Sequence, residues 1–297
     1  MSFTNVPRFT LEKALTNEQS AFFKKNGFLH FKGFISKATV TGFLSELESI
    51  QQELFNKNIT KVNGIPLKLG TDTNGRKFIQ RFAFTSYYSE NLKQFLKDER
   101  LPSLLGLLQP YEARIGENEK DGLVVNHYIN TPDSEYKNLG WHTDSPRDIF
   151  LGSRIMPMLN VGLHLDGCPK ANGGLRILPG THNQGLLSLL FKKKYFIDHR
   201  PDPEEIGFDI EAGDLTVHDG RLWHRVQQSP FTGERSRRRV MYIPFVTGAY
   251  APKHAGSPTP FYHKVGALLL KTKKEKRKSF QGQLVQPAFA ESSVAGS

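Results

Sequence analysis

The stretch NLGWHTDSPRD, residues 138–148, places His142 and Asp144 two positions apart. On an extended strand, residues i and i+2 point to the same face, so an imidazole and a carboxylate would lie side by side. Two ligands rarely hold a catalytic metal, and His224 in GDLTVHDGRLWH, which follows another strand-like run, is the best third ligand. Two histidines and one carboxylate leave one side of a metal open, which is the ligand set of non-haem Fe(II) oxygenases.

Two other histidine–carboxylate pairs compete with this interpretation. His164 and Asp166 in GLHLDG repeat the same spacing, and His218 precedes Asp219 in VHDG. Taken singly, each is explained by ordinary structure, because such histidines are more often strand residues and such aspartates belong to turns. His142 differs because a histidine and several arginines follow it in suitable positions.

The elements that must position these residues change in character near residue 120. Upstream, Thr16 with Gln19 forms a capping box for one helix, and Ser36 can cap a second helix. GFLHF reads as a short strand between them, and Asn74-Gly75 predicts a hairpin. Two further short helices are expected at 89–98 and 102–109.

Downstream of residue 120, short strand-like runs are separated by glycine, proline, asparagine and aspartate. This pattern predicts a β-sandwich or barrel. The runs are GLVVNHYIN, PMLNVGLHLDG, LRILPG, GDLTVHDG and RRVMYIPFV. We therefore expect one domain over residues 1–297, with a helical layer at about 10–110, a β core at about 115–250 and a basic, mobile tail at about 270–297.

The composition sets the class of protein. The chain has 297 residues, of which 38% are hydrophobic and 23% charged, as in soluble globular proteins. No apolar run reaches the roughly 20 residues of a membrane helix, and the N-terminus lacks the apolar region of a signal peptide. With Cys168 as the one cysteine, a disulfide framework is impossible. We expect a cytoplasmic protein without membrane partners.

The formal net charge is +11, and much of it lies in two clusters. One contains Arg235 and the arginines at 237–239, and the other is the lysine-rich run at 271–278. The second run lacks the interleaved aromatic residues that stack on bases, so we do not expect nucleic acid as a partner. We interpret it as a solvated segment, and the excess charge suits an anionic small-molecule substrate.

Four motifs together resemble a known family. WHTD, NGGLRILPGTH, GDLTVHDGRLWH and RRRVMYIPF occur in order, and the chain is similar over roughly residues 16–250 to the phytanoyl-CoA dioxygenase family of Fe(II)/2-oxoglutarate oxygenases. The resemblance implies a mainly β fold with flanking helices, whose core is a double-stranded β-helix, a jelly roll of the cupin type. It also implies Fe(II), 2-oxoglutarate and O2 as cofactor and co-substrates.

Site roles follow from the resemblance. His142, Asp144 and His224 match its iron ligands, which are also its catalytic residues. The family's arginine, which pairs with the distal carboxylate of 2-oxoglutarate, matches Arg238 when counted back from MYIPF and Arg235 when counted forward from His224. Arg239 would point to the opposite face from Arg238 on a regular strand. We favour Arg238, because a planar guanidinium binds a carboxylate with two parallel hydrogen bonds.

The strand before His142 supplies further binding residues by the same resemblance. Asn126 and Tyr128 share one strand face and are expected to contact co-substrate or substrate, although a polar interior face alone would explain them. Gln80 and Arg81 are weaker substrate-contact residues. Because Asp144 is present, we expect hydroxylation or a related oxidation, not halogenation. The alternative is a non-catalytic jelly-roll binding protein with the same fold.

Overall fold

The structure is a computed structural model that describes residues 6–132, 134, 136–144 and 155–260. The described residues up to Pro258 form one compact unit. Its helices are α1 (Asn17–Asn26), α2 (Lys37–Asn56), α3 (Glu90–Phe95) and α5 (Leu186–Phe191), with 3-10 turns η1 (Thr85–Tyr88), η2 (Leu101–Leu108), η3 (Lys170–Asn172) and η4 (Thr181–Asn183). The basic run at 271–278 and the tail expected from about 270 lie outside the described residues.

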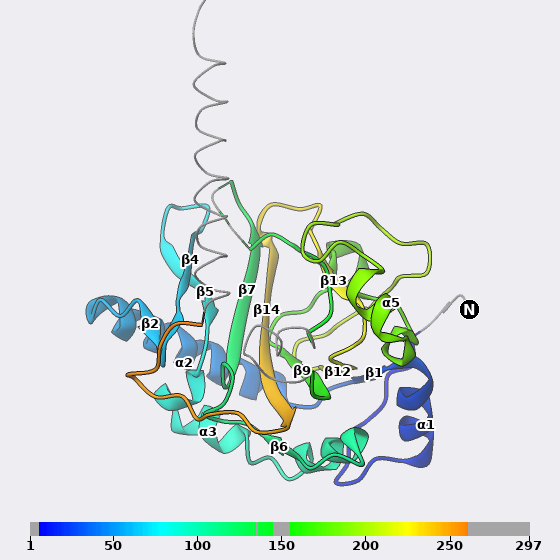
Figure 1. The fold of residues 1–297 in the computed structure, drawn as a ribbon. Coiled ribbons are helices and arrows are strands. Elements are labelled where there is room, and N and C mark those ends of the chain that lie inside the picture. The colour runs from blue at the N-terminus through cyan, green and yellow to red at the C-terminus, as the bar shows by residue number, and fades with distance from the viewer. Residues whose placement is uncertain (1–5, 133, 135, 145–154, 261–297) are drawn as a thin grey trace, which may run out of the picture. The chain divides into compact units, whose positions relative to one another are not determined.

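The larger sheet runs in the order β1-β12-β9-β14-β7-β5-β4, and β6 also pairs with β14 (Figure 1). All of its strand pairs are antiparallel. The strands are β1 (Phe28–Phe31), β4 (Lys68–Thr71), β5 (Lys77–Phe82), β6 (Ala113–Ile115), β7 (Val124–Asn130), β9 (Met158–His164), β12 (Leu215–Asp219) and β14 (Gly233–Thr247). Strands β1, β4 and β5 precede residue 110, so the N-terminal segment adds strands as well as helices.

The smaller sheet runs in the order β11-β10-β13-β8. Its strands are β8 (Leu139–His142), β10 (Gly174–Ile177), β11 (Ile206–Gly207) and β13 (His224–Gln227), and a separate hairpin joins β2 (Lys61–Val62) to β3 (Ile65–Pro66). Tyr128 and Val240 of the larger sheet pack in one apolar cluster with Val226 of the smaller sheet. The two sheets thus enclose a common interior, and the predicted double-stranded β-helix is confirmed.

Local sequence signals explain where the first helices begin. The Thr16 side chain accepts a hydrogen bond from the Gln19 amide and the Gln19 side chain accepts one from the Thr16 amide, so the predicted capping box is present. Ser36 caps α2 in the same manner through the Thr39 amide. The helix expected near 102–109 is instead the 3-10 segment η2, with a proline in its first turn.

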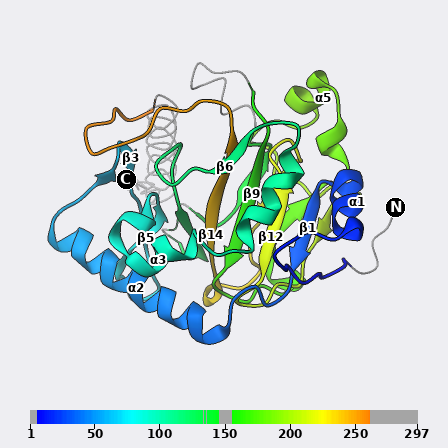
Figure 2. The same ribbon diagram turned by 90° about the horizontal axis from the view of Figure 1, so that it is seen from below.

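Helix α2 covers the outer face of the larger sheet. It crosses behind β5, β7 and β14 (Figures 1 and 2), and its buried Val40, Phe43 and Ile50 belong to the same core cluster as Met241 of β14. Such a helix needs an apolar stripe along one side only, which matches the helical spacing of these residues. The layer stiffens the strands whose opposite face forms the interior.

Asp214 connects the N-terminal segment to the larger sheet through hydrogen bonds, and its substitution should lower the stability of the fold. Its buried carboxylate accepts hydrogen bonds from His30 Nε2 at 2.8 Å, the amides of Gly33 and Glu211 at 2.8 and 3.0 Å, and Arg8 Nη2 at 3.0 Å. Asp214→Asn should destabilise the protein by about 3 kcal/mol, because one donor then faces an amide N–H and the charge is lost. Thermal unfolding should show a Tm lower by roughly 6–12 °C.

The same contacts set the pH dependence of this effect. Burial raises the pKa of Asp214, but the hydrogen bonds from His30, Glu211 and Gly33 outweigh burial and lower the pKa to about 2. A depressed carboxyl pKa stabilises the fold above the unfolded pKa of roughly 3.9. The Tm difference between Asp214→Asn and the unaltered protein should therefore be constant near neutral pH and shrink as pH falls from about 4 toward 2. An undiminished difference at pH 2 would contradict this assignment.

Candidate metal centre

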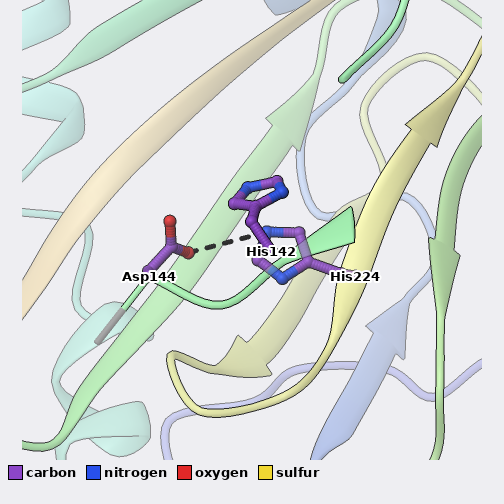
Figure 3. Close-up of side chains that lie close together, drawn as sticks. All are labelled: His142, Asp144 and His224. Atoms are coloured by element: carbon purple, nitrogen blue, oxygen red, sulfur yellow. Dashed lines mark ion pairs between the residues drawn. The ribbon is translucent and has the colours of Figure 1, made fainter. Parts of the chain in front are cut away.

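Three predicted ligands meet in the interior at the end of the smaller sheet. His224 of β13 pairs directly with His142 of β8, and β8 ends at His142, so Asp144 reaches the site from the loop that follows. One ligand atom from each residue lies within 4.8 Å of the other two (Figure 3). The structure therefore brings together the three residues that the sequence pattern selected.

Backbone contacts fix how both imidazoles are presented. Nδ1 of His142 lies 2.8 Å from the carbonyl of Gly140, and Nδ1 of His224 lies 2.9 Å from that of Leu222. A carbonyl only accepts hydrogen bonds, so each Nδ1 carries the proton and each Nε2 keeps a free lone pair. Burial and the neighbouring His224 lower the pKa of His142 to about 3, which keeps this ring neutral.

The carboxylate of Asp144 is oriented by an amide that the sequence did not single out. Asp144 Oδ2 lies 3.7 Å from His224 Nε2 and accepts a hydrogen bond of 2.9 Å from Nδ2 of Asn160 on β9. The Asp144 amide donates to the carbonyl of Gly220 at 2.8 Å. Two imidazole lone pairs and a carboxylate thus converge on one point, and this donor set fits a divalent iron ion.

Arg238 extends from β14 into the interior between the two sheets. Its Nη1 donates to the carbonyl of Gln227 at 2.7 Å and its Nη2 to that of Lys137 at 3.1 Å, while the guanidinium carbon lies 5.8 Å from the centre of the Tyr128 ring. The residue is 5% exposed, its buried Nε has no hydrogen-bond partner, and among the described residues no carboxylate pairs with it. A buried cation with an unused donor fits a carboxylate ligand.

The neighbouring arginines have other surroundings. Arg235 is exposed, and its guanidinium lies 4.2 Å from the centre of the Phe231 ring. Arg239 points to the outer face, as the strand alternation predicted, and its Nε and Nη2 donate to Asp166 at 2.8 and 2.6 Å. Of these three arginines, Arg238 is the one inside the barrel.

The other predicted contact residues also differ in whether they lie on the interior side of the larger sheet. Asn126 faces the interior and accepts a hydrogen bond of 3.0 Å from Arg81, whose other arm pairs with Asp121 at 2.7 Å. Tyr128 is buried beside Arg238. Gln80 donates to Ser134 at 2.7 Å. Asn126, Tyr128 and Arg81 therefore lie on the interior side that Arg238 shares.

Two interior residues escaped the sequence interpretation. His218 lies near the end of β12, as predicted, but the prediction missed its position in the site: it is buried, neither ring nitrogen has a hydrogen-bond partner among the described residues, and its ring centre lies 4.4 Å from that of His224. Asn160 is its direct partner across β9 and β12. The alternation of each strand could have placed both side chains inward, but only the pairing register brings them to the ligands.

Asn160 yields a prediction about metal affinity. Asn160→Leu removes the hydrogen bond that orients Asp144, and loss of such outer partners typically costs about 10- to 100-fold in metal affinity. Fe(II) or Co(II) affinity measured anaerobically by calorimetry should fall by this factor, with an unchanged Tm in the absence of metal as the check on folding. Asn183→Leu, at an exposed position whose side chain donates to the Lys24 carbonyl and not to Asp144, is the matched control. Equal metal affinities in both variants would show that Asn160 does not support metal binding.

A jelly-roll barrel with a buried His-Asp-His cluster at one end defines the class of non-haem iron oxygenases. The sequence model of the phytanoyl-CoA dioxygenase family matches residues 23–238, more than two thirds of the chain. The chain therefore belongs to the phytanoyl-CoA dioxygenase family, and it is an Fe(II)/2-oxoglutarate-dependent dioxygenase that uses O2 as co-substrate.

Individual relatives are distant. A 2-aminoethylphosphonate dioxygenase from uncultured bacterium HF130_AEPn_1 is 22% identical over 236 residues, which cover 77% of this chain and 81% of that protein. HygX from Streptomyces hygroscopicus with nickel and 2-oxoglutarate bound is 17% identical, with coverages of 80% and 90% and a TM-score of 0.54. The α-ketoglutarate-dependent epimerase SnoN of nogalamycin biosynthesis is 17% identical, with coverages of 80% and 85% and a TM-score of 0.55. Because both structures are only 17% identical to this chain, they support the assignment of its fold and nothing further.

Proposed function

We propose that this protein hydroxylates an aliphatic C–H bond of a small-molecule or acyl substrate and releases succinate and CO2. His142, Asp144 and His224 would hold the iron, and Arg238 would bind the distal carboxylate of 2-oxoglutarate. The observation that carries the proposal is the buried Arg238, which has an unused Nε donor and reaches the far end of the strand that begins with His224. His224 and Gln227 are three positions apart on β13, about 10 Å along the strand.

The chain's own residues prepare the site for this reaction. Bound iron with 2-oxoglutarate supplies the oxidising chemistry, in which one atom of O2 enters succinate and the other enters the product. The carbonyls of Gly140 and Leu222 hold each Nδ1 proton, so the rings need not rotate when they bind metal. Arg238, buried among Tyr128 and strand carbonyls, attracts a carboxylate more strongly than an exposed arginine would.

A small-molecule substrate is supported by the named relatives. One acts on 2-aminoethylphosphonate according to its name, and HygX has been crystallised with hygromycin B. For this chain we infer a substrate with an anionic group, since the net charge is +11. Arg81, held by Asp121 and adjoining Asn126 on the interior side, would contact such a group. A screen of paired neutral and anionic compounds by succinate release tests this inference.

The first experiment is an anaerobic titration with Fe(II) and 2-oxoglutarate. The visible charge-transfer band of the chelated co-substrate should appear in the unaltered protein, and succinate release in air should follow once a substrate is present. A protein that binds iron and 2-oxoglutarate but releases no succinate, either with any substrate tested or in the absence of substrate, would favour the non-catalytic jelly-roll alternative. A protein without the band would overturn the proposed site.

A further inference from the structure

Exposed apolar side chains gather on one short segment. Among the described residues, seven large apolar side chains are exposed, and four of them lie between residues 187 and 197. Leu187, Phe191 and Ile197 are each 75% exposed, and Phe196 is 54% exposed. We call these four residues the apolar tip. Single exposed apolar residues are ordinary, but a cluster marks an interaction surface.

The fold itself holds α5 with this face outward. Leu189 is buried, Nε1 of Trp223 donates to the Ser188 carbonyl at 3.2 Å, and the Tyr195 hydroxyl donates to the Leu189 carbonyl at 2.6 Å. Leu187 and Phe191 are four residues apart and therefore share the opposite side of the helix. Turning them inward would break both hydrogen bonds and expose Leu189.

Backbone hydrogen bonds hold Phe196 and Ile197, the second half of the apolar tip, against β8 at the edge of the smaller sheet. The Phe196 amide donates to the Trp141 carbonyl at 2.9 Å, and the Trp141 amide donates to the Asp198 carbonyl at 2.8 Å. The approach is so close that a Cβ at Gly140 would lie 2.7 Å from the Phe196 carbonyl. One side of the Phe196 ring stacks on His142, with ring centres 4.9 Å apart, while Ile197 faces away from the sheet.

Three lysines separate the two halves of the apolar tip, and Asp198 follows its last residue. Lys192 and Lys194 are exposed, and Lys193 is held by Asp202. Figure 2 shows α5 at the margin of the molecule near α1, and the carbonyl of Lys24 in the last turn of α1 accepts a hydrogen bond from Asn183. The last turn of α1 therefore adds the exposed Lys24 and Lys25 to the same side.

Contrary to the expectation of no membrane partner, we propose that the apolar tip docks on the surface of a membrane that contains anionic lipid. An apolar face with lysines beside it matches segments that lie in the bilayer interface, where apolar groups enter the acyl boundary and cations meet headgroups. Lysine is depleted at protein–protein interfaces, and small molecules bind in concave pockets, whereas these side chains protrude. Docking of this kind needs no spanning helix, and none of the described helices has the length and hydropathy to span.

The test measures binding of the full chain to vesicles of phosphatidylcholine alone and of phosphatidylcholine with phosphatidylserine. Anionic vesicles should bind the protein, and Leu187→Ser/Phe191→Ser should lower the partition coefficient by about 10- to 100-fold. This is less than full burial of two apolar side chains would give, because the bilayer interface covers them only in part. Lys192→Gln/Lys194→Gln should lower it by up to about 25-fold, from roughly fivefold per lysine. Leu69→Ser/Tyr111→Ser removes two other exposed apolar residues and is the matched control, which should bind as the unaltered protein does.

The lysine run at 271–278 could bind anionic vesicles by charge alone, so salt separates the two modes. Binding that depends on the tip should persist in part at 0.5 M salt, because apolar burial is not screened. Complete loss at 0.5 M salt, or equal binding by the tip variant and its control, would overturn the proposal. So would a change of molecular mass on size exclusion in the tip variant without any vesicle binding, which would assign the tip to contact between copies of this chain. Each readout is independent of catalysis.

Discussion

His224→Ala is expected to bind Fe(II) at least about 100-fold more weakly than the unaltered protein and to show no succinate release. The loss should exceed the 10- to 100-fold typical of outer partners, because a ligand itself is removed. Two ligands would remain, from β8 and the loop after it, and they cannot fix a metal with an open face. Anaerobic calorimetry with Fe(II), and the charge-transfer band with 2-oxoglutarate, measure the change directly.

His164→Ala is the matched control for this prediction. His164 is also a buried imidazole of the barrel, but its Nε2 contacts the Thr216 hydroxyl at 2.9 Å and it is absent from the ligand cluster. Its variant should retain the metal affinity if it folds, which circular dichroism and Tm will establish. Metal binding that survives in His224→Ala, or is lost to the same degree in a folded His164→Ala protein, would refute the assigned ligand set.

Arg238→Ala should weaken 2-oxoglutarate binding while leaving Fe(II) binding within a factor of about two. Truncating one partner of a buried charge pair costs about 2–5 kcal/mol, or roughly 30-fold to several thousand-fold in affinity. In this protein the cost should lie toward the upper end, because the guanidinium is shielded from water and no described carboxylate competes for it. The measurement is a titration of the iron-loaded variant with 2-oxoglutarate, followed by the charge-transfer band.

Two variants define what Arg238 contributes. Arg238→Lys keeps the charge but loses the planar fork, so it should recover only part of the affinity. Arg235→Ala tests the competing assignment and should leave 2-oxoglutarate affinity unchanged, since that side chain is exposed beside Phe231. A larger loss in Arg235→Ala than in Arg238→Ala would reverse the assignment of the two arginines.

Features encoded by neighbouring residues could be predicted from the sequence. The capping box at Thr16, the cap at Ser36 and the hairpin at Asn74-Gly75 depend on contacts within a few positions, and all three are present. The strands after residue 120 could be predicted as well, because turn residues separate them. The spacing of His142 and Asp144 also pointed to one site, although β8 ends at His142 and Asp144 reaches that site from the loop, not from the extended strand that the prediction assumed.

Features that depend on pairing register could not be predicted. Asn160 and His218 meet the ligands only because β9 pairs with β12 at these two positions, and nothing in either strand states which residue faces which. The choice between Arg235 and Arg238 had the same origin, because counting back from MYIPF indicates Arg238 and counting forward from His224 indicates Arg235, and the register shift between Gly233 and Arg238 is not readable from the sequence. Asp166 was expected to be a turn residue, yet its carboxylate binds Arg239 from 73 positions away.

The contact between Asp166 and Arg239 helps to fix the pairing register of β14. Residues 237, 238 and 239 are all arginine, so a slip of one position would still place an arginine inside the barrel, but with the strand's other side chains inverted. Asp166 accepts from the backbone amide of Arg239 at 2.7 Å as well as from its guanidinium. These two contacts hold Arg239 on the outer side of the strand, which leaves Arg238 facing the interior. The carboxylate thus fixes the pairing register of a stretch in which three successive arginines would otherwise allow more than one alignment.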